Sequence, residues 1–255
     1  MKGAVENMSS DNTSPRYADT ALVLAAHGSR RRPEANALID AHAAEIDYRH
    51  LFASVHTVFL MGGPDPQDVI QNISARRIII VPFMMSDGYL VDVITERLRS
   101  VVSADNNQSI DVSDPIGTHS EIAAITADIA ENLLDRSSIL AKNATLVLVA
   151  HGAKERPESK AGAMLHLRAI EEMGRFAAVH VALLEEPPFI DDIINMVSGP
   201  SVIVGLFAAP GGHAIDDVQT AIAKSNRKDM LNAGPIGTDI RMIDLAIDRA
   251  ISKIS

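Results

Sequence analysis

The chain has 255 residues, a formal net charge of −10 at pH 7, no Cys, no Trp and only 4% aromatic residues. The lack of Cys excludes disulfides, thiolate metal sites and Cys nucleophiles. The acidic balance and the scarcity of aromatic residues argue against nucleic-acid binding, which needs a basic footprint and stacking platforms. No run reaches the roughly 18 apolar residues of a membrane span, and the N-terminus lacks the apolar core of a signal peptide. The sequence predicts a cytoplasmic globular protein that uses His and carboxylate chemistry.

The first half of the chain alternates apolar runs with helical patterns. Residues 1–18 are polar and rich in Ser and Asn, which predicts a disordered leader. Continuous apolar runs, typical of parallel strands buried on both faces, predict strands at 20–26, 54–61, 77–84 and about 110–116. Helices are expected at 33–48, 66–73, 88 to about 102, and 120 to about 134. This alternation predicts an α/β fold with a parallel sheet and right-handed crossovers.

The second half repeats the same order after a connection at 135–143. Strands are expected at 146–150, 180–184, 202–207 and 231–236, and helices from 157, at 189–196, from 214 and at 239–254. The chain is therefore predicted to form two lobes, 19–138 and 139–255, each a parallel four-stranded sheet flanked by helices.

The two halves also match residue by residue. Leu22–Glu34 reads LVLAAHGSRRRPE and Leu146–Glu158 reads LVLVAHGAKERPE, at one shift of 124 positions (151 − 27 = 124). The same shift holds without a gap for more than sixty residues, and it places Asp92 on Asp216. Chance similarity between two short motifs would not extend so far, so the chain is an internal duplication.

The differences between the two copies indicate where chemistry is expected. The second copy has His151, Glu185 and His213, and the corresponding residues of the first copy are His27, Met61 and Tyr89. All six lie at or just beyond the C-terminal ends of predicted strands, at the edge where open α/β sheets bind ligands. Two imidazoles and a carboxylate can bind a metal or move protons, and the second copy alone has this set.

Basic residues follow both His-Gly turns directly. They are Arg30, Arg31, Arg32, Lys154 and Arg156. Together with backbone N–H groups at the adjoining helix N-termini, such side chains can pair with the carboxylates of a small anionic ligand.

The motifs resemble those of the class II chelatases of tetrapyrrole synthesis, most closely the sirohydrochlorin chelatases that insert cobalt or iron. The resemblance covers nearly the whole chain from about Ala21, and its motifs are AHGSR, AHGAKERPE, the acidic element Glu185–Pro188 and GGHAIDD at Gly211–Asp217. It implies two flavodoxin-like lobes that face each other across a cleft, with the macrocycle held between them and no tightly bound cofactor.

The resemblance also implies roles for the second copy. His151 and His213 would act on the metal and the pyrrole nitrogens, and Glu185 matches the acidic position, with the adjacent Glu186 as the alternative. The metal is a substrate, and a His and carboxylate set suits Co²⁺, Fe²⁺ or Ni²⁺.

The first copy departs from this pattern, because Met61 and Tyr89 replace the acid and the second His. We therefore expect the first lobe to form the other wall of the cleft, with His27 and Tyr89 lining it against the substrate. The five basic residues would bind the acidic side chains of the macrocycle.

Three functions compete at this point. The first is a chelatase, a lyase that inserts a metal into sirohydrochlorin in cobalamin or sirohaem biosynthesis. The second is a carrier that binds metal or tetrapyrrole in the same cleft without turnover. A histidine phosphatase ranks last, since that motif needs Arg before the His and the chain has Ala26 and Ala150 there. Because a duplication can replace a dimer, we expect a monomer with pseudo-twofold lobes, or a weak homodimer.

Overall fold

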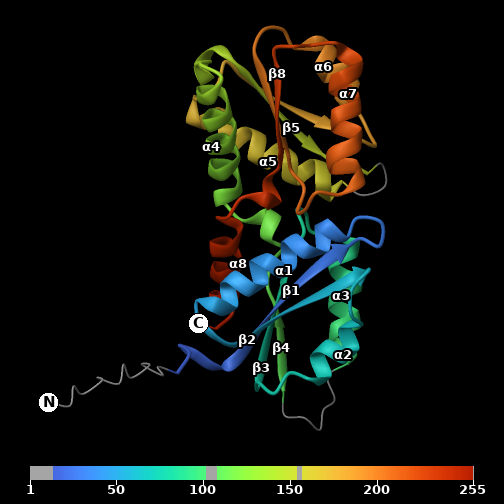
Figure 1. The fold of residues 1–255 in the computed structure, drawn as a ribbon, viewed down its shortest axis with the longest axis vertical. Helices are drawn as coiled ribbons and strands as arrows, with labels where there is room; N and C mark the ends of the chain where they lie inside the picture. Colours follow the sequence, from blue (N-terminus) through green and yellow to red (C-terminus); the bar gives the residue numbers. More distant parts are fainter. Residues whose placement is uncertain (1–13, 102–107, 154–156, 255) are drawn as a thin grey trace, which may run out of the picture.

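In a computed structural model, the chain forms two α/β lobes stacked along the long axis of the molecule (Figure 1). The structure describes residues 14–101, 108–153 and 157–254, without the side chains of residues 213 and 214. Each lobe contains a four-stranded parallel sheet, in the orders β2-β1-β3-β4 and β6-β5-β7-β8. The predicted fold class is confirmed. Among the described helices, none is long and apolar enough to cross a membrane.

The elements follow the predicted order in both repeats. The first repeat contains β1 (Tyr17–Gly28), α1 (Pro33–Tyr48), β2 (Phe52–Met61), α2 (Pro66–Gln71), β3 (Arg77–Pro82), α3 (Tyr89–Arg99), β4 (Ser109–Val112) and α4 (Glu121–Arg136). The second contains β5 (Thr145–Ala150), α5 (Glu158–Met173), β6 (Ala178–Leu183), α6 (Ile190–Met196), β7 (Ser201–Gly205), a π-helix (His213–Asp217), α7 (Val218–Ser225), β8 (Met230–Pro235) and α8 (Met242–Ile251). The predicted fourth strand extended to 116, but β4 ends at Val112 because Ile116–Thr118 forms a 3₁₀ turn.

The central strands explain the apolar runs in the sequence. Residues 21–26 of β1 and 145–150 of β5 are buried, since each strand has neighbours on both sides and helices on both faces of its sheet. One core cluster of buried apolar side chains continues through both lobes and includes Leu24 of β1 and Leu148 of β5. The lobes therefore share a core.

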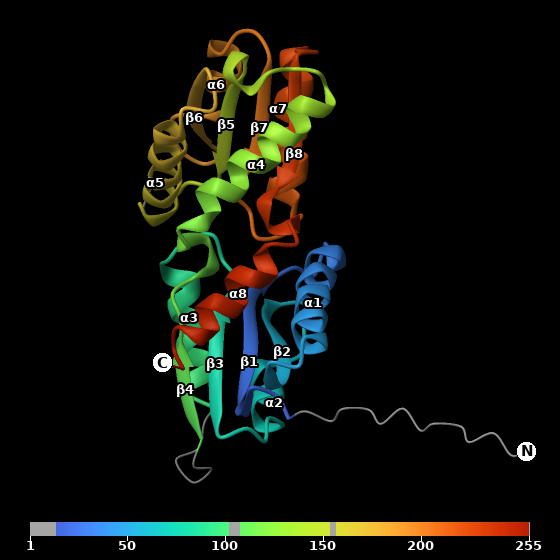
Figure 2. The ribbon, with the colours of Figure 1, turned by 90° about the vertical axis from the view of Figure 1, so that its left-hand side faces the viewer.

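The last helix of each repeat packs on the other repeat's sheet. Helix α4 lies against α5, β7 and β8, whereas α8 lies against α1 and β3 (Figure 2). Ion pairs fasten both helices: Arg49, which follows α1, contacts Asp244 of α8 at 2.5 Å, and Arg175, which follows α5, contacts Asp128 of α4 at 2.8 Å. The packing units thus differ from the predicted lobes 19–138 and 139–255, because α4 and α8 are exchanged.

Two buried histidines, for which no role was predicted, also join the lobes. His42 of α1 contacts the carbonyl of Gly237 with Nε2 at 2.9 Å, and His166 of α5 contacts the carbonyl of Gly117 at 2.8 Å. The two histidines are 124 positions apart, so the contact is reciprocal (166 − 42 = 124). Each imidazole donates to a turn of the other repeat.

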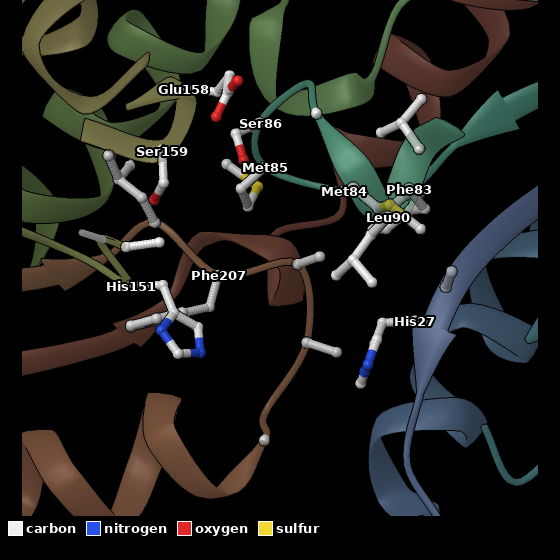
Figure 3. Close-up of a pocket in the computed structure, with 18 of the residues that line it drawn as sticks. His27, Phe83, Met84, Met85, Ser86, Leu90, His151, Glu158, Ser159 and Phe207 are labelled. Atoms are coloured by element: carbon white, nitrogen blue, oxygen red, sulfur yellow. The ribbon is translucent and has the colours of Figure 1, made fainter. Parts of the chain in front are cut away.

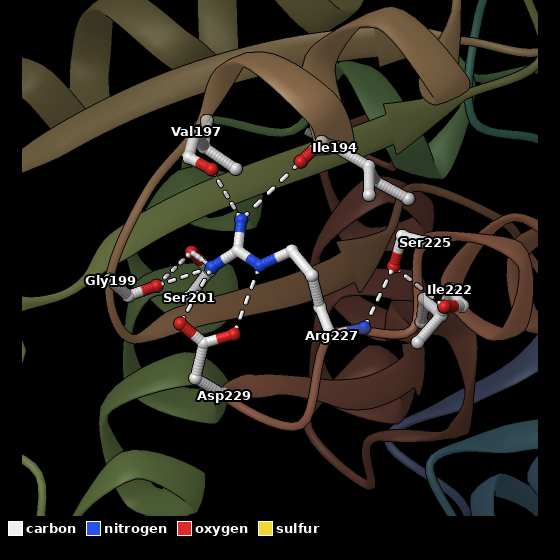
Figure 4. Close-up of polar contacts among 8 residues, drawn as sticks. All are labelled: Ile194, Val197, Gly199, Ser201, Ile222, Ser225, Arg227 and Asp229. Atoms are coloured by element: carbon white, nitrogen blue, oxygen red, sulfur yellow. Dashed lines mark hydrogen bonds and ion pairs between the residues drawn. The ribbon is translucent and has the colours of Figure 1, made fainter.

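At the amino ends of the strands, one side chain closes the loop in each lobe. Arg227 donates to the carbonyls of Val197 and Gly199, both at 2.5 Å (Figure 4). In the first lobe, Gln108 donates to the carbonyls of Ile73 and Ala75 at 2.6 and 3.0 Å. These two residues are the equivalents of Val197 and Gly199 in the first repeat. These contacts stabilise the end of each sheet that lies away from the predicted site.

Candidate functional site

A cavity of about 530 Å³ lies between the lobes, at the carboxyl ends of both sheets. Its lining comes mainly from the segments after β1, β3, β5 and β7, and the segment after β6 and helix α1 also contribute. The lining side chains are mostly apolar and include Phe83, Met84, Met85, Leu90 and Phe207 (Figure 3). The cavity lies where the sequence predicted a cleft. Residues 84, 85 and 90 had no predicted role, although they lie at or near the end of the predicted strand 77–84, at the edge where ligands were expected.

Both His-Gly turns depend on the glycine. Gly28 and Gly152 have φ of 70° and 71°, a region that L side chains rarely adopt. A Cβ on Gly28 would lie 2.2 Å from the Met61 carbonyl oxygen, and one on Gly152 would lie 2.9 Å from Cγ of Glu186. The turn therefore lets the first and second strands of each sheet approach closely, while the preceding His enters the cavity.

His151 and Glu185 meet at the edge of the second sheet. Nδ1 of His151 lies 3.4 Å from Oε1 of Glu185, and both residues line the cavity. The separation exceeds that of a good hydrogen bond. Because the side chains are 43% and 50% exposed, both can also reach a ligand in the cavity. The carboxylate of Glu185 therefore lies beside the imidazole of His151 at the wall of the cavity.

Glu186 has a different environment from Glu185. Its carboxylate accepts a hydrogen bond from the Ala153 backbone N–H at 2.9 Å and lies 3.7 Å from Nζ of Lys160. The Glu186 side chain is only 14% exposed. Of the two adjacent acids, Glu186 therefore braces the turn after β5, and Glu185 faces the cavity.

His213 can be placed by its backbone alone. It begins the π-helix directly after Gly211 and Gly212, which line the cavity. Its side chain lies outside the described residues, so its part in the predicted His/Glu/His set stays a prediction. Among the side chains that the structure describes, no group of three His, Asp or Glu is arranged to hold a metal. A π-helix at this point fits a functional site, where such turns are frequent.

The first copy contributes a different wall. His27 is exposed in the cavity, and its Nδ1 lies 2.9 Å from the Gly28 carbonyl, to which it donates (Figure 3). Tyr89 begins α3, lines the cavity and is 55% exposed. Met61 is also exposed but does not line the cavity. The first lobe thus offers an imidazole, a phenol and apolar side chains to a bound ligand.

The predicted basic residues differ in position. Arg30 and Arg31 are exposed and do not line the cavity, and Lys154 and Arg156 lie outside the described residues. Arg32 contacts Asp216 of the second lobe, and this carboxylate raises the pKa of the Arg32 guanidinium above its ordinary value. The anion-binding role of the basic residues stays a prediction.

Comparison with known proteins agrees with the duplication. The model of the CbiX family matches residues 21–133 and 145–253, one match for each repeat. A probable sirohydrochlorin cobaltochelatase of Halobacterium salinarum is 24% identical over 267 residues, which cover 90% of each chain.

Three solved structures share the fold. CbiX, described as the terminal enzyme for biosynthesis of siroheme in denitrifying bacteria, has a TM-score of 0.77 at 19% identity over 92% of this chain and 100% of its own. SirB from Bacillus subtilis, solved with Fe³⁺, has a TM-score of 0.75 at 18% identity over 92% of this chain and 95% of its own. DR2241 from Deinococcus radiodurans, a multi-domain protein with structural similarity to chelatases, has a TM-score of 0.79 at 23% identity over 91% of this chain. The chain spans 55% of the length of DR2241.

Proposed function

Because the chain belongs to the CbiX family of sirohydrochlorin chelatases, we propose that it inserts Co²⁺ or Fe²⁺ into sirohydrochlorin in cobalamin or sirohaem biosynthesis. The observation that supports this most is the contact of His151 with Glu185 in a cavity that both lobes line. A flat macrocycle can lie between the two walls, with the reacting pair on one side.

The reaction needs a base and a metal donor that releases its metal. A free tetrapyrrole loses two pyrrole N–H protons as the metal sheds water and enters the ring. An imidazole with an ordinary pKa of about 6.5 is largely neutral near pH 7, so it can take such a proton. In this proposal His151 accepts a pyrrole proton, and the neighbouring Glu185 stabilises the resulting imidazolium. His213 would accept the second pyrrole proton and would complete the set that delivers the metal.

The opposite wall would hold the macrocycle. Leu90, Met84 and Phe83 can pack against the ring, and Tyr89 and His27 add polar groups at its face. The acidic substituents of the ring would extend toward the rim, near the basic segment after β1. The first lobe then binds the substrate, and the second lobe carries out the chemistry.

The metal is a substrate, and the donor set suits more than one ion. Imidazole and carboxylate ligands accept Co²⁺, Fe²⁺ and Ni²⁺, and geometry and supply choose among them more than affinity does. A cytoplasmic location and a monomeric state with pseudo-twofold lobes stay predictions.

The test is an anaerobic absorbance assay with purified protein, sirohydrochlorin and each of Co²⁺, Fe²⁺ and Ni²⁺ in turn. We expect insertion to run faster than in a protein-free control with Co²⁺ or Fe²⁺, and His213→Ala to lose that acceleration. Asp191→Asn, a change at an exposed residue of α6, is the matched control and should retain it. Wild-type protein that binds the macrocycle without accelerating insertion would be a carrier, and the proposal would fail.

A further inference from the structure

An ion pair spans the rim of the cavity from one lobe to the other. Arg32 lies in the loop after β1, and Nη2 contacts the carboxylate of Asp216 in the π-helix of the second lobe. Neither residue lines the cavity, but each lies within four positions of a residue that does. The Arg32 backbone N–H donates at 3.0 Å to Oγ of Ser29, a lining residue, and Asp216 follows the lining residue Gly212 by four positions.

This pair is poorly suited to holding the lobes together. Its side chains are 32% and 56% exposed, and ion pairs in water contribute little to stability because solvent screens them. The lobes are already joined by the exchanged helices α4 and α8, by a shared core and by two buried histidines. A structural role at the rim would therefore be redundant.

The Asp216 carboxylate is the same chemical group as the acidic substituents of the proposed ligand. Guanidinium groups bind carboxylates with a planar fork, and here the fork of Arg32 is shared between Asp216 and Glu34, the latter at 3.5 Å. An internal carboxylate thus lies where the acidic substituent of a ring in the cavity would meet a positive charge.

We propose that Asp216 is a placeholder for a substrate carboxylate: one acidic side chain of the bound macrocycle displaces Asp216 from Arg32. This inference rests on the proposed function, since it requires a polycarboxylate ligand in the cavity. Arg32 is then a specificity residue for the acidic ring substituent, and Asp216 is its internal competitor. The two partners of one ion pair should consequently have opposite effects on binding.

The experiment is a titration of the full chain with uroporphyrin I, a porphyrin with eight carboxylates, followed by its absorbance band. We expect Asp216→Asn to lower the Kd about 3- to 10-fold, and Arg32→Gln to raise it by a similar factor. In the double variant Asp216→Asn/Arg32→Gln, the gain should vanish, because no guanidinium is left to release. Asp191→Asn removes the same charge from exposed α6 and should leave the Kd unchanged.

Each other result would overturn the placeholder role. If both single variants weaken binding, the pair is a structural latch. If Asp191→Asn tightens binding as much as Asp216→Asn, the cause is the overall negative charge of the chain. Unchanged affinity in both variants, or wild-type protein that does not bind uroporphyrin I, would also refute it. Metal insertion by the wild type separates the two proposals. If the wild type does not insert metal, the chelatase function is refuted. If the wild type inserts metal but Asp216→Asn does not bind uroporphyrin I more tightly, the placeholder role alone is refuted.

Discussion

The two His-Gly turns have the same backbone conformation at the glycine, but different side chains hold each turn in place. In the first lobe one buried side-chain amide holds the turn: Asn36 accepts from the Ser29 N–H at 2.8 Å and donates to the Gly62 carbonyl at 3.0 Å. In the second lobe the Ser159 hydroxyl accepts from the Gly152 N–H at 3.2 Å, and two charged groups add to this brace. Glu186 accepts from the turn's N–H, and Lys160, at the position equivalent to Asn36, donates to the Pro187 carbonyl at 2.8 Å.

Under the proposed function, this difference lets one duplicated fold carry a reactive site in one copy. The turn is kept in both copies because the glycine and its brace are structural. The second copy adds a second acid, Glu185, which faces the cavity beside His151, whereas the equivalent residue of the first copy is Met61. The brace and the reacting group are thus neighbours in sequence with separate roles.

The largest expected effect on stability comes from adding a side chain at the glycine of the first turn. Gly28→Ala should lower the free energy of unfolding by at least about 3 kcal/mol, since a left-handed residue costs roughly 1–3 kcal/mol and its Cβ would overlap a backbone oxygen. Gly152→Ala should cost only about 1–2 kcal/mol, because the flexible Glu186 side chain can move aside. Urea unfolding measures both. Equal losses of unfolding free energy in the two variants would show that the space around Gly28 and Gly152 does not differ in effect.

The braces should also differ in strength. Asn36→Ala removes both hydrogen bonds of a side chain that is 7% exposed, which should cost about 1–3 kcal/mol. Lys160→Ala removes a side chain that is 40% exposed and should cost about 1 kcal/mol or less. The same unfolding assay applies, and a larger loss for Lys160→Ala would reverse the comparison.

The two adjacent acids can be separated by activity. Glu185→Gln should slow metal insertion roughly 10-fold or more, since an amide cannot stabilise an imidazolium as a carboxylate does. Glu186→Gln should stay within about 3-fold of wild type, because the amide oxygen still accepts from the Ala153 N–H. Steady-state rates of metal insertion measure both effects. A greater loss of rate in Glu186→Gln would contradict the assignment of Glu185 to the reaction and Glu186 to the turn.

The smallest effect concerns the contacts that cross between lobes. Burial lowers the pKa of His166 below its ordinary value of 6.5, and the hydrogen bond to the Gly117 carbonyl opposes this in part. The unfolded chain therefore binds this proton more readily, so the contribution of His166 is full above pH 6.5 and declines as the pH falls below it. Between pH 7 and 5, the free energy of unfolding should fall less in His166→Gln than in wild type. Identical slopes would contradict this assignment.

Much of the fold could be predicted because the apolar runs and the internal shift of 124 are local signals. They predicted both sheets and the edge where the cavity lies, with His151 and Glu185 at that edge. The exchange of α4 and α8 could not be predicted, since an amphipathic pattern shows that a helix buries one face but not which sheet covers it. The braces Asn36 and Glu186 depend on contacts between distant turns, and the same is true of the interlobe histidines.

The central claim, that the chemistry belongs to the second lobe, is tested most directly by two equivalent substitutions. Single-turnover metal insertion should slow about 100-fold or more in His151→Ala, and less than about 10-fold in His27→Ala, which should mainly weaken substrate binding. Equal losses of rate in the two variants, or a greater loss in His27→Ala, would contradict the account.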